Sequence, residues 1–417
     1  MPKFTQAQWD KVFALLDQDE ARFELPKSRP GSVVLSSFNI RKLGMVKNRS
    51  AGAWEFLRRF AERCDLLAIQ EVSDNLEGLN HLKDMLGDPY GMVASDITGG
   101  VPASKLGMTE RLAYLFRWER VARSEVASDL TFDRSSVAER LLAGRKVFGK
   151  ALLAREKELN AWEDEFQNRV EAWEAAGRPG SRPRRKKKPS FLLPEFLTFI
   201  RTPHCVSFRI LGAGTSIDFL AVNAHLLFGH KDKQREERYQ EFLALMSWLV
   251  DRARQVRNLY HKNLILFGDL NLDFTEADTR RAEIEADLMA LNKGQLVGTK
   301  RAKVNFPFLD IHPSRAHIAD PNKATWRSTA RLSETYDQIA MFLGDEHLPN
   351  DKANETAGAT PDGFDYRVFR FTDLFAEALH GKAYDALTKA QKKALIAKFE
   401  HDVSDHLPIW IRLPVPA

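Results

Sequence analysis

The sequence contains few cysteines and no long apolar run. Only Cys64 and Cys205 occur among its 417 residues, too few for a disulfide framework, so we expect two reduced thiols. No segment approaches the roughly 18 consecutive apolar residues of a membrane-spanning helix. The N-terminal residues show no basic stretch followed by an apolar one, the pattern of a secretory signal. We therefore expect a cytoplasmic protein that does not contact membranes.

Excess positive charge is confined to one place. The net charge is +5, and the run "SRPRRKKKP" at 181–189 contains six positive residues and no negative one. Without this run the chain would carry a net charge of −1, which argues against a basic surface spread over the whole molecule. The run is either a solvated linker or a contact for the phosphates of a nucleic acid.

Short apolar runs alternate with helical patterns along most of the chain, whose composition is 44% hydrophobic and 29% charged. The runs expected to form strands are 32–40, 65–72, 111–118, 205–211, 217–226, 263–272, 336–343 and 407–413. Helical patterns lie at 6–20, 232–256, 277–291 and 384–400. Several strands are apolar nearly throughout, as expected when both faces of a sheet are covered. The alternation predicts a layered α/β or α+β fold.

Residues 135–176 interrupt this alternation with a long, charged helical pattern. Its apolar residues recur at steps of three and four, and they are Leu159, Trp162, Phe166, Val170 and Trp173. The basic run follows, with glycine and proline that end the helix. The helix either packs on the body or projects as a coiled-coil arm that binds a partner or a second copy. We expect an N-terminal helical segment at 1–30, a main domain at 31–121 and 197–417, and this helical insertion with its basic linker at 122–196.

Polar residues lie where the predicted strands begin or end. The motifs are FNIRKLG, IQEV, TERL, VNAHL, FGDLNL, TYDQI and SDHLPI. Ligands of layered α/β proteins gather at one edge of the sheets, and carboxylates beside apolar runs are costly unless paired or bound to metal. One such residue alone would be a turn residue or a satisfied core group, whereas the repetition indicates a site.

This ordered set of motifs resembles the endonuclease/exonuclease/phosphatase superfamily, and more narrowly its deoxyribonuclease I-like branch. The resemblance runs from about Val33 to Leu413, interrupted by the helical insertion. GDLN or SDH alone would be a weak signal, but seven motifs in the same order are specific. The resemblance implies a four-layer α/β/β/α sandwich of two packed mixed sheets, with the site at the strand edge between them.

The resemblance also implies a role for each polar residue at that edge. The implied metal ligands are Asn39, Glu71 and Asp405, and the implied substrate-binding residues are Arg41, Arg201 and Tyr336. The implied catalytic residues are Glu110, His225, Asp269, Asn271, Asp337 and His406. Among these, His225 and His406 are the two catalytic histidines, with Asp337 as the partner of His406.

The chemistry of these residue types agrees with the hydrolysis of a phosphodiester. Carboxylate and amide oxygens suit Mg²⁺ or Mn²⁺ rather than zinc. Two histidines, each paired with a carboxylate, can act as general acid and general base near neutral pH. Which histidine is the acid, and how many metal ions bind, stay open at this point.

Two positions depart from the deoxyribonuclease I-like pattern. Ser73 stands where the branch usually has an arginine, and Met108 stands where it has a tyrosine; both of those residues contact DNA in relatives. We expect a divalent-metal-dependent phosphodiester hydrolase, with a deoxyribonuclease I-like endonuclease acting on DNA as the first hypothesis. The alternatives are a phosphoesterase acting on a phospholipid, an inositol phosphate or a nucleotide, and a non-catalytic binding protein built around the arm.

Overall fold

The computed structural model describes most of the chain. The described residues are 2–97, 109–131, 134–186, 188–189, 198–212, 216–229, 232–254, 261, 263–272, 286, 303–309, 326–343 and 347–415. Met108 lies outside the described residues, and so does the helix expected at 277–291 apart from residue 286. None of the helices in these ranges combines the length and the apolar character needed to cross a bilayer.

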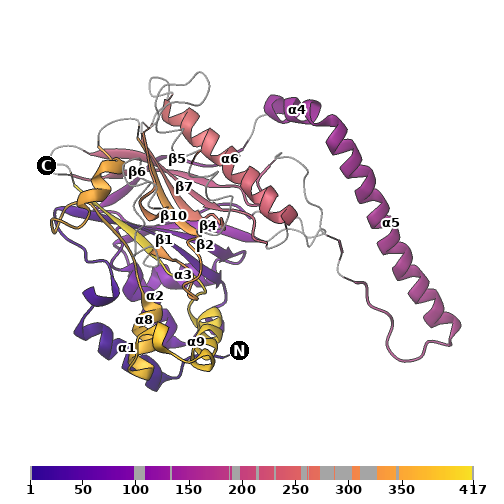
Figure 1. The fold of residues 1–417 in the computed structure, drawn as a ribbon, viewed down its shortest axis with the longest axis horizontal. Coiled ribbons are helices and arrows are strands. Elements are labelled where there is room, and N and C mark those ends of the chain that lie inside the picture. Colours follow the sequence, from indigo (N-terminus) through magenta and orange to yellow (C-terminus); the bar gives the residue numbers. More distant parts are fainter. Residues whose placement is uncertain are drawn as a thin grey trace.

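Two mixed sheets of six strands pack against each other (Figure 1). The first sheet has the order β11 (Asp365–Val368), β12 (Ile409–Pro414), β1 (Ser32–Leu43), β2 (Leu66–Ser73), β4 (Glu110–Arg117) and β3 (Tyr90–Ala94). The second has the order β5 (Val121–Asp129), β6 (His204–Ile210), β7 (Ile217–His225), β8 (Asn263–Asp269), β10 (Asp337–Leu343) and β9 (Lys303–Asn305). The pairs β1–β2 and β7–β8 are parallel.

Helices cover the outer faces of both sheets. On the side of the first sheet lie α1 (Gln6–Gln18), α2 (Ala51–Ala61), α3 (Glu77–Leu86), α8 (Phe371–His380) and α9 (Lys389–Asp402). On the other side α6 (Asp232–Arg254) lies across the second sheet (Figure 1). Short 3-10 helices are η1 (Ala21–Phe23), η2 (Val46–Asn48), η3 (Pro307–Leu309), η5 (Asp351–Thr356) and η6 (Tyr384–Ala386). The predicted four-layer sandwich with a helical insertion is confirmed.

Strand β8 shows why its sequence is apolar throughout. Ile265 and Phe267 belong to the core that fills the space between the sheets, whereas Leu264 and Leu266 pack with the residues of α6. Successive side chains of a strand point to opposite faces, so a strand between two layers needs apolar residues at every position. The same alternation on β7 directs His225 toward the space between the sheets.

The insertion begins later than expected. Residues 122–129, which we assigned to the insertion, form most of β5, which pairs with β6 in register from Val121↔Ile210 to Asp129↔His204. Its sequence VARSEVASD alternates with polar residues because β5 is an edge strand with one solvated face. Because of these polar side chains, the strand contains no apolar run and was not predicted from the sequence.

The insertion projects from the sandwich. Helix α4 (Arg134–Ala143) leads into α5 (Arg145–Ala175), which runs away from the body (Figure 1). The indole of Trp162 donates a hydrogen bond to the carbonyl of Lys186 at 3.1 Å, and the guanidinium of Arg185 lies 4.7 Å from the ring centroid of Phe166. The returning basic run of the same chain therefore covers part of the apolar stripe of α5, at Trp162 and Phe166.

Candidate active site

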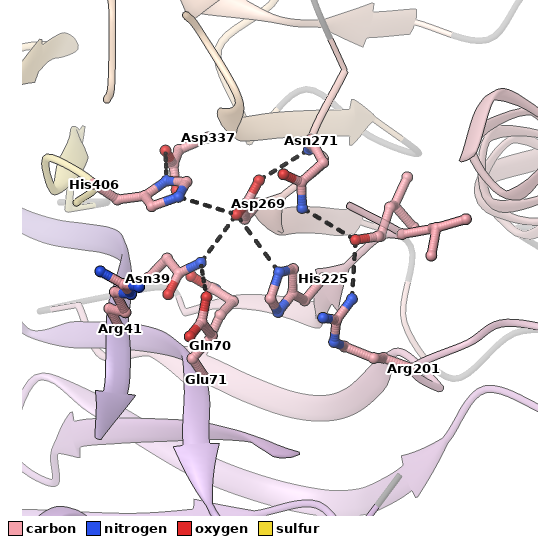
Figure 2. Close-up of polar contacts among 12 residues, drawn as sticks. Asn39, Arg41, Gln70, Glu71, Arg201, His225, Asp269, Asn271, Asp337 and His406 are labelled. Atoms are coloured by element: carbon pink, nitrogen blue, oxygen red, sulfur yellow. Dashed lines mark hydrogen bonds and ion pairs between the residues drawn. The ribbon is translucent and has the colours of Figure 1, made fainter. Parts of the chain in front are cut away.

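The polar strand ends meet at one edge of the sandwich (Figure 2). His225 at the end of β7 is in register with Asp269 at the end of β8, and Asp269 is in register with Asp337 at the start of β10. From the other sheet, Asn39 on β1 donates through Nδ2 to Asp269 Oδ2 at 2.9 Å. This hydrogen bond joins two residues that are 230 positions apart in the sequence.

Asp269 is the centre of the site and is fully buried. Its Oδ2 lies 3.6 Å from His225 Nε2 and 3.4 Å from His406 Nε2. The backbone N–H of Asn271 donates to Oδ1 at 2.9 Å. Burial alone would raise the pKa of Asp269, but His406 and His225 outweigh it and hold that pKa below its ordinary value. Asp269 is thus an ionised acceptor between two imidazoles.

His406 is held by a second carboxylate on its far side. Its Nδ1 lies 2.8 Å from Asp337 Oδ2, which also accepts a hydrogen bond from Ser328 Oγ at 2.6 Å. Burial alone would lower the pKa of His406, but Asp337 and Asp269 raise it well above the ordinary value. Burial also raises the pKa of Asp337. Both shifts favour a proton that stays on this pair.

His225 has a different neighbour. Its Nδ1 lies 3.3 Å from Glu110 Oε2, and Arg201 Nε donates to the same oxygen at 2.6 Å. Burial would raise the pKa of Glu110, but His225 and Arg201 together hold it below its ordinary value. Arg201 also donates through Nη1 to the carbonyl of Leu226 at 3.1 Å. Arg201 therefore fixes a carboxylate and the loop after β7 instead of pointing freely into solvent.

Glu71 and Asn39 lie side by side at the mouth of the site. Asn39 Nδ2 donates to Glu71 Oε1 at 3.2 Å, and the N–H of Lys42 donates to Oε2 at 3.2 Å. Glu71 has φ of 59°, in the left-handed region that costs a non-glycine residue about 1 kcal/mol. Glu71 lies within β2 at the position where its pairings with β1 and β4 shift register, so this conformation belongs to an irregularity of the strand.

Two of the three implied metal ligands carry an oxygen atom that could bind a cation. Asn39 Oδ1 and Asp405 Oδ1 are buried oxygen atoms with no hydrogen-bond partner among the described residues. With the carboxylate of Glu71, which accepts a hydrogen bond from Asn39, the donor atoms would all be oxygens, which suits Mg²⁺ or Mn²⁺. The other oxygen of the Asp405 carboxylate, Oδ2, lies 3.6 Å from Arg41 Nε. Asp405 therefore has a positively charged side chain near it in addition to any bound metal ion.

A second group of potential ligands exists. Among the described residues, ligand atoms of Asp269, Asp337 and His406 lie within 4.8 Å of one another. A protonated imidazole cannot bind a metal, and the raised pKa of His406 explains the closeness of the two carboxylates without a cation. A protonated His406 thus balances part of the charge of the two carboxylates.

Arg41 and Tyr336 lie at the border of the site. Arg41 Nη1 donates to the carbonyl of Glu400 at 3.1 Å and lies 3.4 Å from its carboxylate. The ring centroid of Tyr336 lies 6.3 Å from that of His406. Arg41 is thus held by α9, whereas Tyr336 flanks the proposed acid–base group.

Two residues that were not among the expected site residues join the two sheets next to the site. Gln70 Nε2 donates to Asn223 Oδ1 at 2.7 Å and so joins β2 of one sheet to β7 of the other. Asn223 Nδ2 donates in turn to the carbonyls of Ile69 and Ala113, each at 3.1 Å. The signal for Asn223 was its position two residues before His225, since alternate residues of a strand share a face.

Ser404 was also missed. Its Oγ donates to the carbonyl of Asn39 at 2.6 Å and accepts from the N–H groups of Arg41 at 3.1 Å and His406 at 3.2 Å. This one hydroxyl fixes the end of β1 against the loop before β12. The motif SDHLPI contained it, but serine before aspartate has the ordinary appearance of a turn.

A cavity of ≈ 360 Å³ lies beside Glu71 and Glu110. It is lined by Lys42, Gly44, Met45, Asn48, Glu71, Ser73, Asp74, Asn75, Thr109 and Glu110. Both Glu71, an implied metal ligand, and Glu110, the neighbour of His225, line this cavity. The two histidines and Asp269 are not among the residues that line it.

Comparisons with known proteins give one curated relative and several solved structures. No family model matches the chain. A stretch of 97 residues is 32% identical to Deoxyribonuclease-1 of Oryctolagus cuniculus and covers 22% of this chain and 33% of that protein. The chain thus matches about a third of the length of that relative.

The solved structures are similar at low identity. The human Nocturnin catalytic domain with bound sulfate is 12% identical, with a TM-score of 0.43 and coverage of 93% of this chain and 95% of that one. Truncated Caenorhabditis elegans TDP2 is 12% identical, with a TM-score of 0.42 and coverage of 92% and 98%. An endonuclease/exonuclease/phosphatase family protein from Bacteroides thetaiotaomicron is 13% identical, with a TM-score of 0.41 and coverage of 93% and 96%. The family that the motifs resemble thus recurs among the similar proteins.

Proposed function

We propose that this chain is a divalent-metal-dependent phosphodiester hydrolase that cleaves DNA as a deoxyribonuclease I-like endonuclease. The observation that carries the proposal is the placement of buried Asp269 between His225 and His406, at 3.6 and 3.4 Å, with a further carboxylate beyond each imidazole. A fold does not require two such histidine–carboxylate groups at one edge, whereas hydrolysis needs a proton acceptor and a proton donor.

Each side chain then has one task in the reaction. Asn39, Glu71 and Asp405 would hold Mg²⁺ or Mn²⁺, which offsets the charge on the phosphoryl oxygens when bound. The raised pKa of His406 keeps Nε2 protonated, which favours donation to a phosphoryl or leaving oxygen. His225, oriented by Glu110, accepts the proton of a water that Asp269 and Asn271 position.

The site residues indicate the type of reaction more directly than the class of substrate. Ser73 lines the cavity at the position where the deoxyribonuclease I-like branch has a DNA-contacting arginine. A phosphoesterase acting on a phospholipid, an inositol phosphate or a nucleotide is therefore the second candidate, because a small substrate needs no such contact outside the site.

The proposal is tested by incubating the purified protein with supercoiled plasmid, linear duplex, single-stranded DNA, RNA and a small phosphodiester. Each substrate is offered with Mg²⁺, with Mn²⁺ and with EDTA. We expect nicking of the plasmid that requires the metal and is lost in His225→Ala. Cleavage of the small ester alone would select the second candidate, and no cleavage of any substrate would contradict both.

The basic run supports a contact with nucleic acid outside the cavity. Within it, Arg185 lies 2.8 Å from Glu163 on α5, and Lys186 pairs with Glu165. Arg182, Arg184 and Lys188 are exposed. Two of the six charges thus hold the arm together, and exposed ones remain for phosphates.

Replacing Arg182, Arg184 and Lys188 together by glutamine should weaken DNA binding and lower the slope of log affinity against log salt by about 2 to 3. The slope is measured by fluorescence anisotropy in EDTA between low and physiological salt. The matched control replaces three exposed lysines near α9, Lys382, Lys389 and Lys393, by glutamine. Equal slopes in both variants would show that the run is only a linker.

The arm also presents apolar side chains. Leu142, Leu152 and Leu153 are 63%, 59% and 62% exposed. They lie near the junction of α4 and α5, away from the part of the stripe that the returning run covers. We propose in addition that the arm contacts a protein partner or a second copy of the chain through these side chains.

A further inference from the structure

Helix α6 carries a buried carboxylate that has no part in the proposed proton transfers. The side chain of Glu241 is almost fully buried, with a relative exposure of 2% for the residue. Its Oε1 accepts a hydrogen bond from the N–H of Ile200 at 2.6 Å, and its Oε2 accepts one from the N–H of Leu227 at 2.8 Å. Each oxygen of one carboxylate thus holds a different segment of the chain. Burial of a carboxylate is costly unless it is compensated, so these two charge-assisted bonds are a substantial part of what keeps Glu241 in place.

Both segments lead directly into the site. Ile200 precedes Arg201, which donates to Glu110 at 2.6 Å. Leu227 follows Leu226, whose carbonyl accepts a hydrogen bond from Arg201 Nη1 at 3.1 Å. Glu241 therefore lies one residue away from each end of the Arg201–Leu226 contact.

The loop after β7 is fixed from two further directions. The N–H of Leu226 donates to the carbonyl of Asp269 at 3.0 Å, and Asn271 Nδ2 donates to the carbonyl of Leu226 at 3.1 Å. From α6, Arg238 Nη1 donates to the carbonyls of Leu227 at 3.3 Å and Gly229 at 3.0 Å. Helix α6 therefore holds this loop through two side chains. The carboxylate of Glu241 accepts a hydrogen bond from a backbone N–H of the loop, and the guanidinium of Arg238 donates to two backbone carbonyls of the loop.

We propose that Glu241 is a positioning residue, whose ionised carboxylate sets the distance between the Arg201 segment and the loop after His225, so that Glu110 stays beside the imidazole. The inference rests on the proposed function of the site, because it assigns Glu241 an effect on that reaction. Glu241 acts through Arg201 and Leu226, and it touches neither the metal ligands nor the space for the substrate.

The charge of Glu241 changes in the physiological range. Burial raises its pKa to about 7, against the two N–H groups that lower it. Of the charged groups that face it, Glu237 on the same helix raises the pKa and Arg201 lowers it, while Arg238 binds the adjacent loop. Protonation converts one acceptor oxygen into a donor, so one of the two N–H bonds is lost. The positioning is thus largely complete at pH 8, half lost near pH 7 and lost as the pH falls below 6.

Glu241→Gln tests the inference, because the amide keeps the shape and loses the charge and one acceptor. Hydrogen exchange of the backbone amides at 199–201 and 226–229, measured at pH 8, should be about tenfold faster than in the wild type. The matched control is Glu236→Gln on the same helix, with unchanged exchange at both segments. This measurement does not depend on any activity of the protein.

Kinetics supply the second measurement. The ratio of kcat of the wild type to kcat of Glu241→Gln should be about tenfold at pH 8 and approach one below pH 6, since both proteins then carry a neutral side chain. A ratio removes the titration of other groups that the two proteins share. KM should change less than kcat, because Glu110 and His225 act in the chemical step.

Three outcomes would overturn the inference. These are unchanged exchange at both segments, a kcat ratio near one at every pH, or a ratio that is constant with pH, which indicates a structural role without dependence on charge. If Glu241→Gln does not fold, Glu241→Asp keeps the charge but is one methylene too short to span both amides. It should then release only one of the two segments and retain the loss of activity at low pH. If the wild type hydrolyses no phosphodiester, the proposed function fails, while the exchange experiment still decides the positioning.

Discussion

Replacement of His406 by alanine is expected to lower kcat for phosphodiester hydrolysis by about 10³-fold. The imidazole is the group whose pKa the site raises well above its ordinary value, through Asp337 at 2.8 Å and Asp269 at 3.4 Å. Without it no described side chain at this position can deliver a proton to the departing oxygen. KM should change little, because the metal and the remaining groups still bind the phosphate. Steady-state kinetics at saturating metal concentration measure both constants.

Two companion variants make the result specific. His401→Ala removes an imidazole from the last turn of α9 and should leave kcat within a factor of two or so of the wild type. Asp337→Asn keeps the shape of the pair but removes one of the two charges that offset burial, so the pKa of His406 should fall. If His406 is the general acid, the alkaline limb of the profile of kcat against pH then moves to lower pH. A loss of less than tenfold in His406→Ala, or an alkaline limb that does not move, would take the acid role away from His406.

The second large effect concerns the metal. Glu71→Gln should raise the Mg²⁺ or Mn²⁺ concentration for half-maximal activity by about 100-fold, since outer-shell changes alone cost about 10- to 100-fold in affinity. Glutamine can still accept the hydrogen bond that Lys42 N–H gives to Glu71 at 3.2 Å, so the variant tests the negative charge and not the backbone conformation at this position. Titration of Mn²⁺ followed by electron paramagnetic resonance measures the affinity without any substrate.

The control for Glu71 lies in the same cavity. Asp74 is an exposed carboxylate that lines the cavity three residues further on, and Asp74→Asn changes the local charge by the same amount. Its metal affinity should stay within about threefold of the wild type, as expected for a screened charge at the surface. Equal losses in the two variants would mean that the cavity attracts cations only through its general charge, and equal retention would remove Glu71 from the metal site.

The strands that the sequence predicted are those buried on both faces. In β8 every residue from Leu264 to Phe267 is buried, and the apolar run therefore marks both the strand and its place between two layers. The strands that were missed, β3, β5, β9 and β11, are short or carry polar residues. An edge strand such as β5 buries only one face, so apolar residues are needed at only every second position and no continuous apolar run marks the strand.

The site shows the same division between local and long-range information. The pairing of His406 with Asp337 could be anticipated because each lies in a recognisable motif, although 69 positions separate them. The bond between Gln70 and Asn223 could not, because it depends on how the two sheets face each other across 153 positions. Arg201 was expected beside a phosphate, whereas in the structure it binds Glu110 and Leu226.

The attachment of the arm has a consequence for how freely it can vary. Strands β5 and β6 are hydrogen-bonded neighbours, and just beyond them the N–H of Leu130 donates to the carbonyl of Pro203 at 2.8 Å, so the whole insertion is the connection of one antiparallel hairpin. Each doubling of a flexible connection costs only about 0.6 kcal/mol of closure entropy, so about seventy residues in place of about four would cost on the order of 2 to 3 kcal/mol. The register of the sheet does not depend on what the connection contains. The hairpin can therefore serve as a grafting point, where an arm of another length or binding preference replaces α4 and α5 while Ile200 and Arg201, which contact Glu241 and Glu110, are kept.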